Sequence, residues 1–334
     1  MMPPLLEVRR LSLETVAHGQ KRRLLRDVSF EIETGEIVAL VGESGSGKTL
    51  TALAIARLLP NNVRQHAGEI RLGGERIDAL AEEAMCRIRG KRIGMIFQEP
   101  MTSLNPVLTV GFQVEEGMRI HGFPASEVRR RAKEYLAAVR FRDPERIFRS
   151  YPHELSGGER QRAMIAAVLA PSPELVIADE PTTALDVTIQ KEILEVLREL
   201  QSRGTPEDSS GKTSFLFISH DLAVVSEIAD RILVLYRGSL VEVGPPEKVL
   251  SAPAHPYTKA LLDAIPRERL RLPEPPPGDE GEGEENEPEG KCIYFSRCPL
   301  ADAVCRKEPG LSGLEGRQEH RVKCVKPLLG TGKE

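Results

Sequence analysis

The 334-residue sequence lacks most of the features that would place a chain within a membrane, in a secretory pathway or on nucleic acid. It has no run of about eighteen apolar residues, the length needed to cross a bilayer. Residues 1–6 lack the charged and apolar blocks of a signal peptide. The formal net charge of −4 gives no general attraction to nucleic acid. We therefore expect any membrane role to depend on partner proteins.

Other absences mark out regions of the chain. Aromatic residues make up 4% of the sequence, and none precedes Phe30. Between Pro273 and Gly290 there is no Lys or Arg, and Pro, Gly and acidic residues dominate. Such a stretch cannot bury a core, so residues 266–290 are expected to form an extended linker. A polar loop at 203–213 suggests no function. The hydrophobic content of 40% is ample for a packed domain before the linker.

Eight residues near the N-terminus match every fixed position of the phosphate-loop pattern G-x-x-x-x-G-K-[ST]. Residues 36–41 before them predict a buried strand and residues 50–56 after them a helix, which is the context that the motif requires. The glycines let backbone N–H groups surround phosphates, and the helix N-terminus attracts negative charge. We expect Lys48 to neutralise the β- and γ-phosphates of ATP and Thr49 to bind Mg²⁺. This phosphate loop comprises Gly42, Glu43, Ser44, Gly45, Ser46, Gly47, Lys48 and Thr49.

Two further apolar runs, residues 175–178 and 216–218, are followed by polar side chains. Ligands of a doubly wound sheet gather outside the carboxyl ends of its strands, so these side chains should meet the phosphate loop. Asp179 is expected to hold Mg²⁺ and Glu180 to polarise the water that attacks the γ-phosphate. His220 is a candidate sensor of the γ-phosphate that holds this water and Glu180 in place.

A second helix start suited to an anion lies at residues 155–159. A serine there is a good N-cap for a helix running to about Leu169, and paired glycines allow a close approach. Because the phosphate loop already supplies a complete cradle, this signature segment predicts contact with a nucleotide held by another molecule. The chain would then form half of two composite ATP sites. The simpler interpretation is a capped helix without a ligand. The residues concerned are Ser156, Gly157, Gly158 and Glu159.

The order of these motifs resembles that of ATP-binding subunits of ABC transporters, over about residues 5–265. Residues 98–106 and 255–262 resemble the oligopeptide/dipeptide importer branch. The resemblance implies an α/β P-loop nucleotide-binding domain with a mixed-sheet core, an antiparallel β layer and a helical subdomain at about residues 100–165. It implies that Gln98 contacts Mg²⁺ and the attacking water, that residues 99–105 face a membrane subunit, and that Asp186 is the D-loop aspartate.

The resemblance also implies a function. The chain would be a peripheral ATPase on the cytoplasmic face of the cell membrane that energises peptide import. Its partners would be a paralogous ATP-binding subunit, two membrane permease subunits and an external substrate-binding protein, with no nucleic acid. The alternatives are a soluble ABC ATPase acting on nucleic acid or ribosomes, and import of another small solute such as glutathione or a metal chelate. Thr15 stands where the family usually has an aromatic residue that stacks on adenine, and His18 is the candidate replacement.

Four of the five cysteines lie in the last 43 residues, with the spacing C-x5-C-x6-C-x18-C. In a cytoplasmic protein such a group favours a metal over disulfides, and four thiolates suit iron–sulfur or zinc. Importer ATPase subunits with this spacing carry a [4Fe–4S] cluster, so the resemblance implies one here, with Zn²⁺ as the alternative. We expect this small extension, residues 291–334, to depend on metal for folding. Cys86 is expected to be a packing residue. The four are Cys292, Cys298, Cys305 and Cys324.

Overall fold

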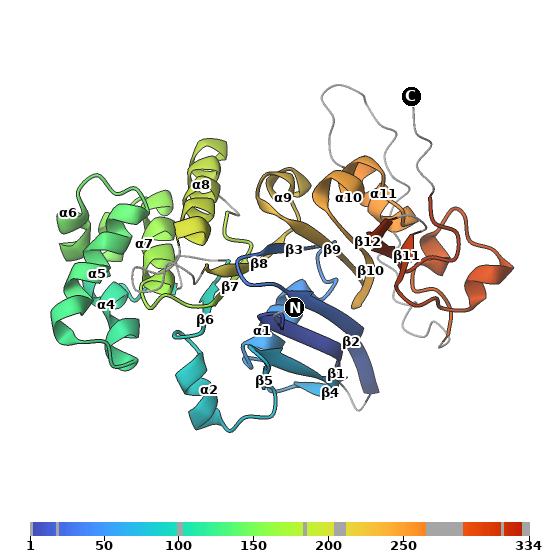
Figure 1. Cartoon of the computed structure of the whole chain (residues 1–334), viewed down its shortest axis with the longest axis horizontal. Coiled ribbons are helices and arrows are strands. Elements are labelled where there is room, and N and C mark those ends of the chain that lie inside the picture. Colours follow the sequence, from blue (N-terminus) through green and yellow to red (C-terminus); the bar gives the residue numbers. More distant parts are fainter. Residues whose placement is uncertain are drawn as a thin grey trace.

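The computed structural model describes residues 3–17, 20–98, 103–182, 186–203, 212–264, 290–314 and 317–328 (Figure 1). They form a central sheet, a smaller antiparallel sheet, a group of helices at one end and a C-terminal extension at the other. Residues 99–102 of the segment expected to face a membrane subunit lie outside this described part, as do 204–211 of the polar loop and 266–289 of the linker.

The central sheet has the strand order β11-β12-β10-β9-β3-β8-β7-β6. Strands β6, β7, β8, β3 and β9 run parallel to their neighbours, whereas β10, β12 and β11 add antiparallel pairs. Parallel strands covered on both faces need nearly continuous apolar sequences, which β3, β7 and β8 have. The predicted mixed sheet is confirmed. Its strands are β3 Ile37–Val41, β6 Ile93–Ile96, β7 Leu175–Asp179, β8 Ser214–Ser219, β9 Arg231–Tyr236, β10 Ser239–Gly244, β11 Ser312–Leu314 and β12 Arg317–Val322.

The predicted antiparallel layer is also confirmed, with the order β2-β1-β4-β5. Alternate residues of β1, including Leu6, Val8, Leu11 and Leu13, are buried and share a core with the helix that follows the phosphate loop. The strands β1 and β2 are long, and they stay paired through three register shifts. The layer comprises β1 Leu6–Ala17, β2 Gln20–Ile32, β4 Val63–Leu72 and β5 Glu75–Arg76.

A group of four helices, α4 to α7, lies at the end of the molecule opposite the extension (Figure 1). Their buried faces share one core with parts of β6, β7 and α8. The group is α4 Val110–Ile120, α5 Ala125–Ala138, α6 Pro144–Arg149 and α7 Gly157–Leu169. The other helices are α1 Lys48–Ile55, α2 Glu82–Ile88, α8 Val187–Arg203, α9 Leu222–Ile228, α10 Pro246–Ser251 and α11 Pro256–Asp263.

The C-terminal extension, residues 290–328 of the described part, is built onto the central sheet. Strand β12 pairs with β10, and Ile293 and Tyr294 join a core that includes residues of β3, β9 and α9. Beneath the junction, His320 Nε2 lies 2.6 Å from Glu242 Oε1, and both side chains are fully buried. The extension therefore shares the core of the preceding domain.

Two further observations concern expectations from composition. Within the described residues, no helix combines the length and the apolar character needed to cross a membrane. Cys86 lies on α2, as predicted for a helix, but it is exposed, with its sulfur 3.7 Å from Glu82 Oε1. The prediction that it is a packing residue was wrong, because its helix buries Met85 and Ile88 instead.

Candidate nucleotide site

The phosphate loop joins the end of β3 to the start of α1. Gly42, Gly45 and Gly47 have φ values of 154°, 76° and 105°, which other residues rarely adopt. A Cβ atom on Gly42 would lie 2.2 Å from the Leu235 carbonyl oxygen, so only glycine fits there. Ser46 Oγ is buried and has no hydrogen-bond partner in the described part of the chain. The loop thus offers a backbone cradle and a spare hydroxyl.

Lys48 is almost fully buried at the first position of α1. Its Nζ donates to the carbonyl oxygens of Gly42 and Glu43, at 2.8 and 3.0 Å, so the side chain folds back over the loop. Burial lowers the pKa of Lys48, and the carboxylates of Glu180, Asp179 and Glu43 oppose this shift. A buried cation surrounded by acids is well suited to bind an added anion such as a phosphate.

Asp179, the last residue of β7, meets Thr49 of α1. Thr49 Oγ1 lies 3.4 Å from Asp179 Oδ1, and Asp179 is 5% exposed. Burial raises the pKa of Asp179, and the hydrogen bond from Thr49 partly offsets this. A hydroxyl and a carboxylate together are oxygen ligands of the kind that Mg²⁺ takes, and the positive charge of a metal ion would favour the ionised carboxylate.

Glu180 follows Asp179 and receives contacts from two other strand ends. Gln98 Nε2 donates to Glu180 Oε2 at 3.1 Å, and His220 Nδ1 lies 3.1 Å from Glu180 Oε1. Gln98 comes from the end of β6 and His220 from the end of β8. Glu180 has φ of 49°, a costly value for a residue with a side chain. Gln98 and His220 therefore contact the two oxygens of a carboxylate that is carried on a strained backbone.

These groups line a single open cavity of about 550 Å³. Parallel strands end at the same edge of a sheet, which is why residues 98, 180 and 220 meet although they are far apart in sequence. The residues predicted from the phosphate loop and from two strand ends are thus brought together with Gln98, which the resemblance implied. The cavity is lined by Ser44, Gly45, Gly47, Lys48, Thr49, Leu50, Gln98, Glu180 and His220.

The signature segment lies elsewhere and does not line this cavity. It begins α7, in the helix group beyond the central sheet (Figure 1). Ser156 Oγ accepts from the Glu159 N–H, and the Glu159 carboxylate accepts from the Ser156 N–H at 2.9 Å, which makes a capping box. That hydrogen bond is the main reason that the pKa of Glu159 is lowered. A Cβ on Gly158 would lie 2.9 Å from Ile189, so α8 packs closely there.

Asp186 caps α8. Its carboxylate accepts from the backbone N–H groups of Thr188 and Ile189, at 3.1 and 3.0 Å. Residues 183–185, which connect it to β7, lie outside the described part of the chain. Neither Asp186 nor the signature segment reaches the chain's own phosphate cavity, so their predicted contact with a nucleotide requires another molecule.

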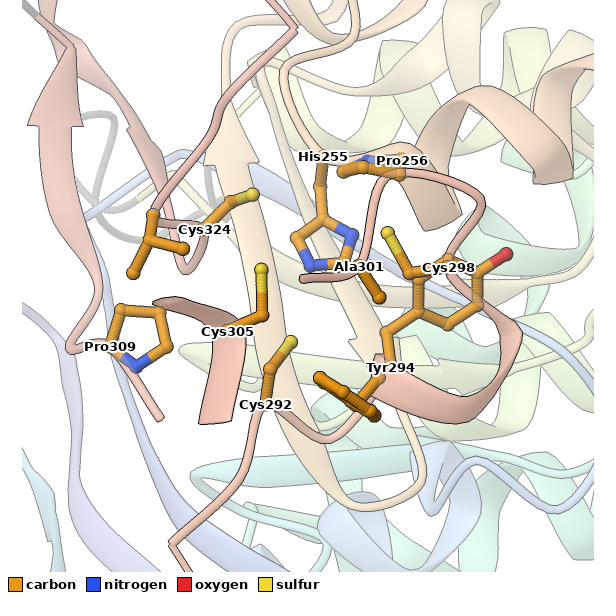
Figure 2. A pocket seen from close by; sticks show the side chains of 11 residues that line it. His255, Pro256, Cys292, Tyr294, Cys298, Ala301, Cys305, Pro309 and Cys324 are labelled. Atoms are coloured by element: carbon orange, nitrogen blue, oxygen red, sulfur yellow. The ribbon is translucent and has the colours of Figure 1, made fainter. Parts of the chain in front are cut away.

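The four C-terminal cysteines line one enclosed cavity, which we call the cysteine cavity (Figure 2). His255, Pro256 and Tyr294 complete part of its wall. Burial raises the pKa of the Cys292 and Cys324 thiols, with smaller contributions from the other cysteines. Within the described residues, no three His, Cys, Asp or Glu side chains are grouped so as to hold a metal ion. The iron–sulfur cluster therefore stays a prediction.

Sequence reasoning missed two residues that hold the phosphate loop from outside. Tyr257 Oη accepts from the Glu43 N–H at 2.9 Å, and Arg297 Nη1 donates to the Glu43 carboxylate at 3.1 Å. Tyr257 lies within the importer-like segment 255–262, which was the one available signal. Thr15 is buried in β1 and donates to the Asn62 carbonyl at 2.9 Å, so its side chain is already engaged. His18 lies outside the described residues.

Comparison with known proteins identifies the family to which these features belong. The family model described as ABC transporter matches residues 25–183, and that of the oligopeptide/dipeptide transporter C-terminal region matches residues 241–305. A probable peptide ABC transporter ATP-binding protein of Sinorhizobium fredii is 47% identical over 320 residues, covering 93% of this chain and 92% of that protein. The dipeptide transport ATP-binding protein DppD of Escherichia coli is 42% identical and covers 98% of both chains.

Solved structures agree with this assignment. A dimeric bacterial ABC transporter cassette matches with a TM-score of 0.62 at 28% identity, covering 72% of this chain and 98% of that one. The protein cbiO1 from Clostridium perfringens matches with a TM-score of 0.64 at 25% identity, covering 75% and 91%. With a phosphate loop and a Gln–Glu–His group around one cavity, and relatives that match along nearly the whole chain, this protein belongs to the ABC transporter family, among the ATP-binding subunits of oligopeptide/dipeptide transporters.

Proposed function

We propose that this chain binds and hydrolyses ATP and thereby energises import of peptides through a membrane complex. The observation that carries the proposal is the meeting of Gln98, Glu180 and His220 with Lys48 and Thr49 around one cavity. The names of the relatives, which include peptide and dipeptide transport ATP-binding proteins, support peptides as the cargo. Glutathione or a metal chelate remains the alternative cargo, because selection belongs to other subunits. No relative reported above is named for a role on nucleic acid or ribosomes.

The chemistry divides among the cavity residues. Lys48 and the N–H groups of residues 44–49 bind the β- and γ-phosphates, where the helix start adds partial positive charge. Thr49, Asp179 and Gln98 would hold Mg²⁺, which would neutralise charge developing on the phosphate oxygens. Glu180 accepts a hydrogen bond from the attacking water and takes its proton. His220 and Gln98 keep the Glu180 carboxylate oriented, at the 3.1 Å contacts described above.

A second cassette completes the site. At the start of α7 the Gly157 and Gly158 N–H groups have no acceptor within the helix, and the Ser156 hydroxyl lies beside them, an arrangement that suits a γ-phosphate. Because this helix start is outside its own cavity, we infer that two cassettes close face to face and that each clamps the ATP of the other. Asp186 caps α8 beside the same face. A solved relative is described as dimeric, which supports this arrangement, and the partner is inferred to be a paralogous subunit.

The remaining partners are two permease subunits and an external substrate-binding protein. The chain would then sit as a peripheral subunit on the cytoplasmic face of the membrane, where ATP is available. Residues 99–105 and the start of the helix group are proposed to carry the motion of the cassettes to the permeases. Phe112, on the first turn of α4, is 45% exposed, and Val107 just before this helix is 74% exposed. Two exposed apolar side chains this close in sequence to residues 99–105 support a protein contact in this region.

We further propose that the cysteine cavity holds a [4Fe–4S] cluster. The donor set fits, because four thiols line one enclosed space and no other ligand type is needed. The resemblance to importer subunits with this cysteine spacing favours the cluster, and Zn²⁺ stays the alternative.

Reconstitution tests the proposed function. Vesicles would contain the chain, its partner cassette and both permeases, with ATP inside and the substrate-binding protein outside. Labelled dipeptides and longer peptides should accumulate only with ATP, and Lys48→Ala should abolish uptake. Labelled glutathione and a labelled metal chelate serve as rival cargo. Uptake of either rival in preference to every peptide would contradict the peptide assignment but leave the ATPase assignment intact.

A further inference from the structure

The C-terminal extension contacts the phosphate loop through Arg297. Arg297 donates to both carboxylate oxygens of Glu43, with Nη1···Oε2 at 3.1 Å and Nη2···Oε1 at 3.5 Å, across 254 positions of sequence. The two side chains are 48% and 44% exposed. An ion pair this exposed contributes little to stability. Any effect of this ion pair on function must therefore come from the position of Glu43 in the phosphate loop.

Glu43 is the second residue of the phosphate loop, and both its backbone N–H and its carbonyl oxygen are hydrogen-bonded. Its N–H donates to Tyr257 Oη at 2.9 Å, and its carbonyl oxygen accepts from Lys48 Nζ at 3.0 Å. Burial lowers the pKa of Lys48, and the Glu43 carboxylate is close enough to oppose this shift in part. A negative charge at this place competes with the phosphates for the same cation. Without a partner, Glu43 would repel a bound triphosphate.

Arg297 is fixed by the turn that carries it. It ends the short helix Phe295–Arg297, which lies between Cys292 and Cys298, and the Phe295 N–H donates to the Cys292 carbonyl at 2.9 Å. Its guanidinium lies over the ring of Tyr236, 5.9 Å from the centroid. Tyr294 in the same turn contacts the rings of Tyr236 and Tyr257 at 5.1 and 5.6 Å. The arginine is therefore positioned before any nucleotide binds.

We propose that Arg297 is a positioning residue for ATP: it neutralises Glu43 and fixes the outer turn of the phosphate loop, which makes the C-terminal extension part of the nucleotide site. The inference rests on the proposed binding of ATP at this loop, but not on a metal in the cysteine cavity. Arg297 acts through Glu43 and has no role in the attack on the γ-phosphate. Its loss should therefore change the affinity for ATP and not the rate of the chemical step.

A double-mutant cycle on the assembled transporter tests the proposal. Arg297→Ala should raise KM for ATP about three- to tenfold and leave kcat within twofold. In a Glu43→Gln background the same change should raise KM less than twofold, because the uncompensated negative charge is gone. The effect in the native background should also shrink at high salt, since both groups are exposed. Arg306→Ala, which removes an exposed arginine from the same extension, is the matched control and should leave KM unchanged.

Further substitutions separate charge from packing, because alanine also removes the stem that lies on Tyr236. Arg297→Lys should recover most of the affinity and Arg297→Gln should not. An unchanged KM in Arg297→Ala would overturn the proposal. So would an equal rise in KM with and without the Glu43 carboxylate, since that result would show an effect on folding of the extension alone. If the native transporter itself fails to bind ATP, the proposed function fails instead.

Discussion

The sharpest prediction concerns replacement of Glu180 by the isosteric amide, Glu180→Gln. The substitution keeps the size of the side chain and removes its ability to accept a proton from water. Glu180 contacts Gln98 Nε2 and His220 Nδ1 through its two oxygens. The new amide oxygen can keep one of these contacts, and Gln98 can rotate its own amide group to satisfy the new NH₂. The geometry of the site should therefore survive.

The expected loss of catalytic rate follows from the role of the Glu180 carboxylate as a general base. A general base contributes roughly 10²- to 10⁴-fold to the rate, which corresponds to about 3–5 kcal/mol of barrier. Binding of ATP depends on Lys48, Thr49 and the loop N–H groups, none of which changes. We therefore expect kcat to fall at least 100-fold while the dissociation constant for ATP stays within about threefold. A closed pair of cassettes should accumulate, because the reopening step needs hydrolysis.

The assay is phosphate release by the assembled transporter, with ATP binding measured separately by equilibrium dialysis. The control is Glu174→Gln, the same chemical change just before the opposite end of β7, where the carboxylate pairs with Arg92 at 2.7 Å. That variant should keep kcat within twofold of the native value. Turnover by Glu180→Gln within tenfold of native would refute the assignment of Glu180 as the base. A large loss of ATP binding would show that the substitution had disturbed the cavity instead.

Three other outcomes are expected. ATPase activity per chain should rise with concentration and with added partner cassette, because each phosphate cavity lacks a signature segment; full activity in a strictly monomeric preparation would contradict composite sites. Anaerobically prepared protein should contain about four irons per chain. The iron should be lost when serine replaces any one cysteine of the cysteine cavity and kept in Cys86→Ser. Stoichiometric zinc without iron would show that the metal is misidentified. His320→Ala should lower the free energy of unfolding by roughly 3 kcal/mol, because it leaves the buried Glu242 carboxylate with backbone donors alone, whereas exposed Glu319→Ala should change it by less than about 0.5 kcal/mol. Amide exchange in β12 would report this last effect locally, and unchanged protection there would contradict it.

The sequence was most informative where a short motif and a strand end coincide. A phosphate loop needs particular glycines and a lysine, and the buried strands β7 and β8 need apolar runs, so both can be identified locally. The meeting of Asp179, Glu180 and His220 with this loop followed from one rule, that ligands collect at the carboxyl ends of parallel strands. The antiparallel layer and α7 were predictable for the same local reasons, although strand lengths were not, because β1 and β2 stay paired through three register shifts.

The cysteine spacing predicted a shared site, but the sequence did not predict the surroundings of individual side chains. It predicted that four thiols would share a site, and they do line one cavity. The sequence could not show that Cys86 is exposed, because the helical period around Cys86 does not indicate which face packs on the domain. Nor could the sequence show that Thr15 donates a hydrogen bond to the Asn62 carbonyl, since that bond depends on how β1 and β4 align.

The sequence alone thus determined the nucleotide chemistry, because each element of the site is encoded by neighbouring residues with strict steric and charge requirements. The tertiary structure alone decided how the C-terminal extension relates to that site. The pairing of β12 with β10, the buried contact of His320 with Glu242 and the bond from Arg297 to Glu43 each join residues at least 78 positions apart. No local pattern encodes such contacts, because they exist only once the sheet and its shared core have brought the segments together.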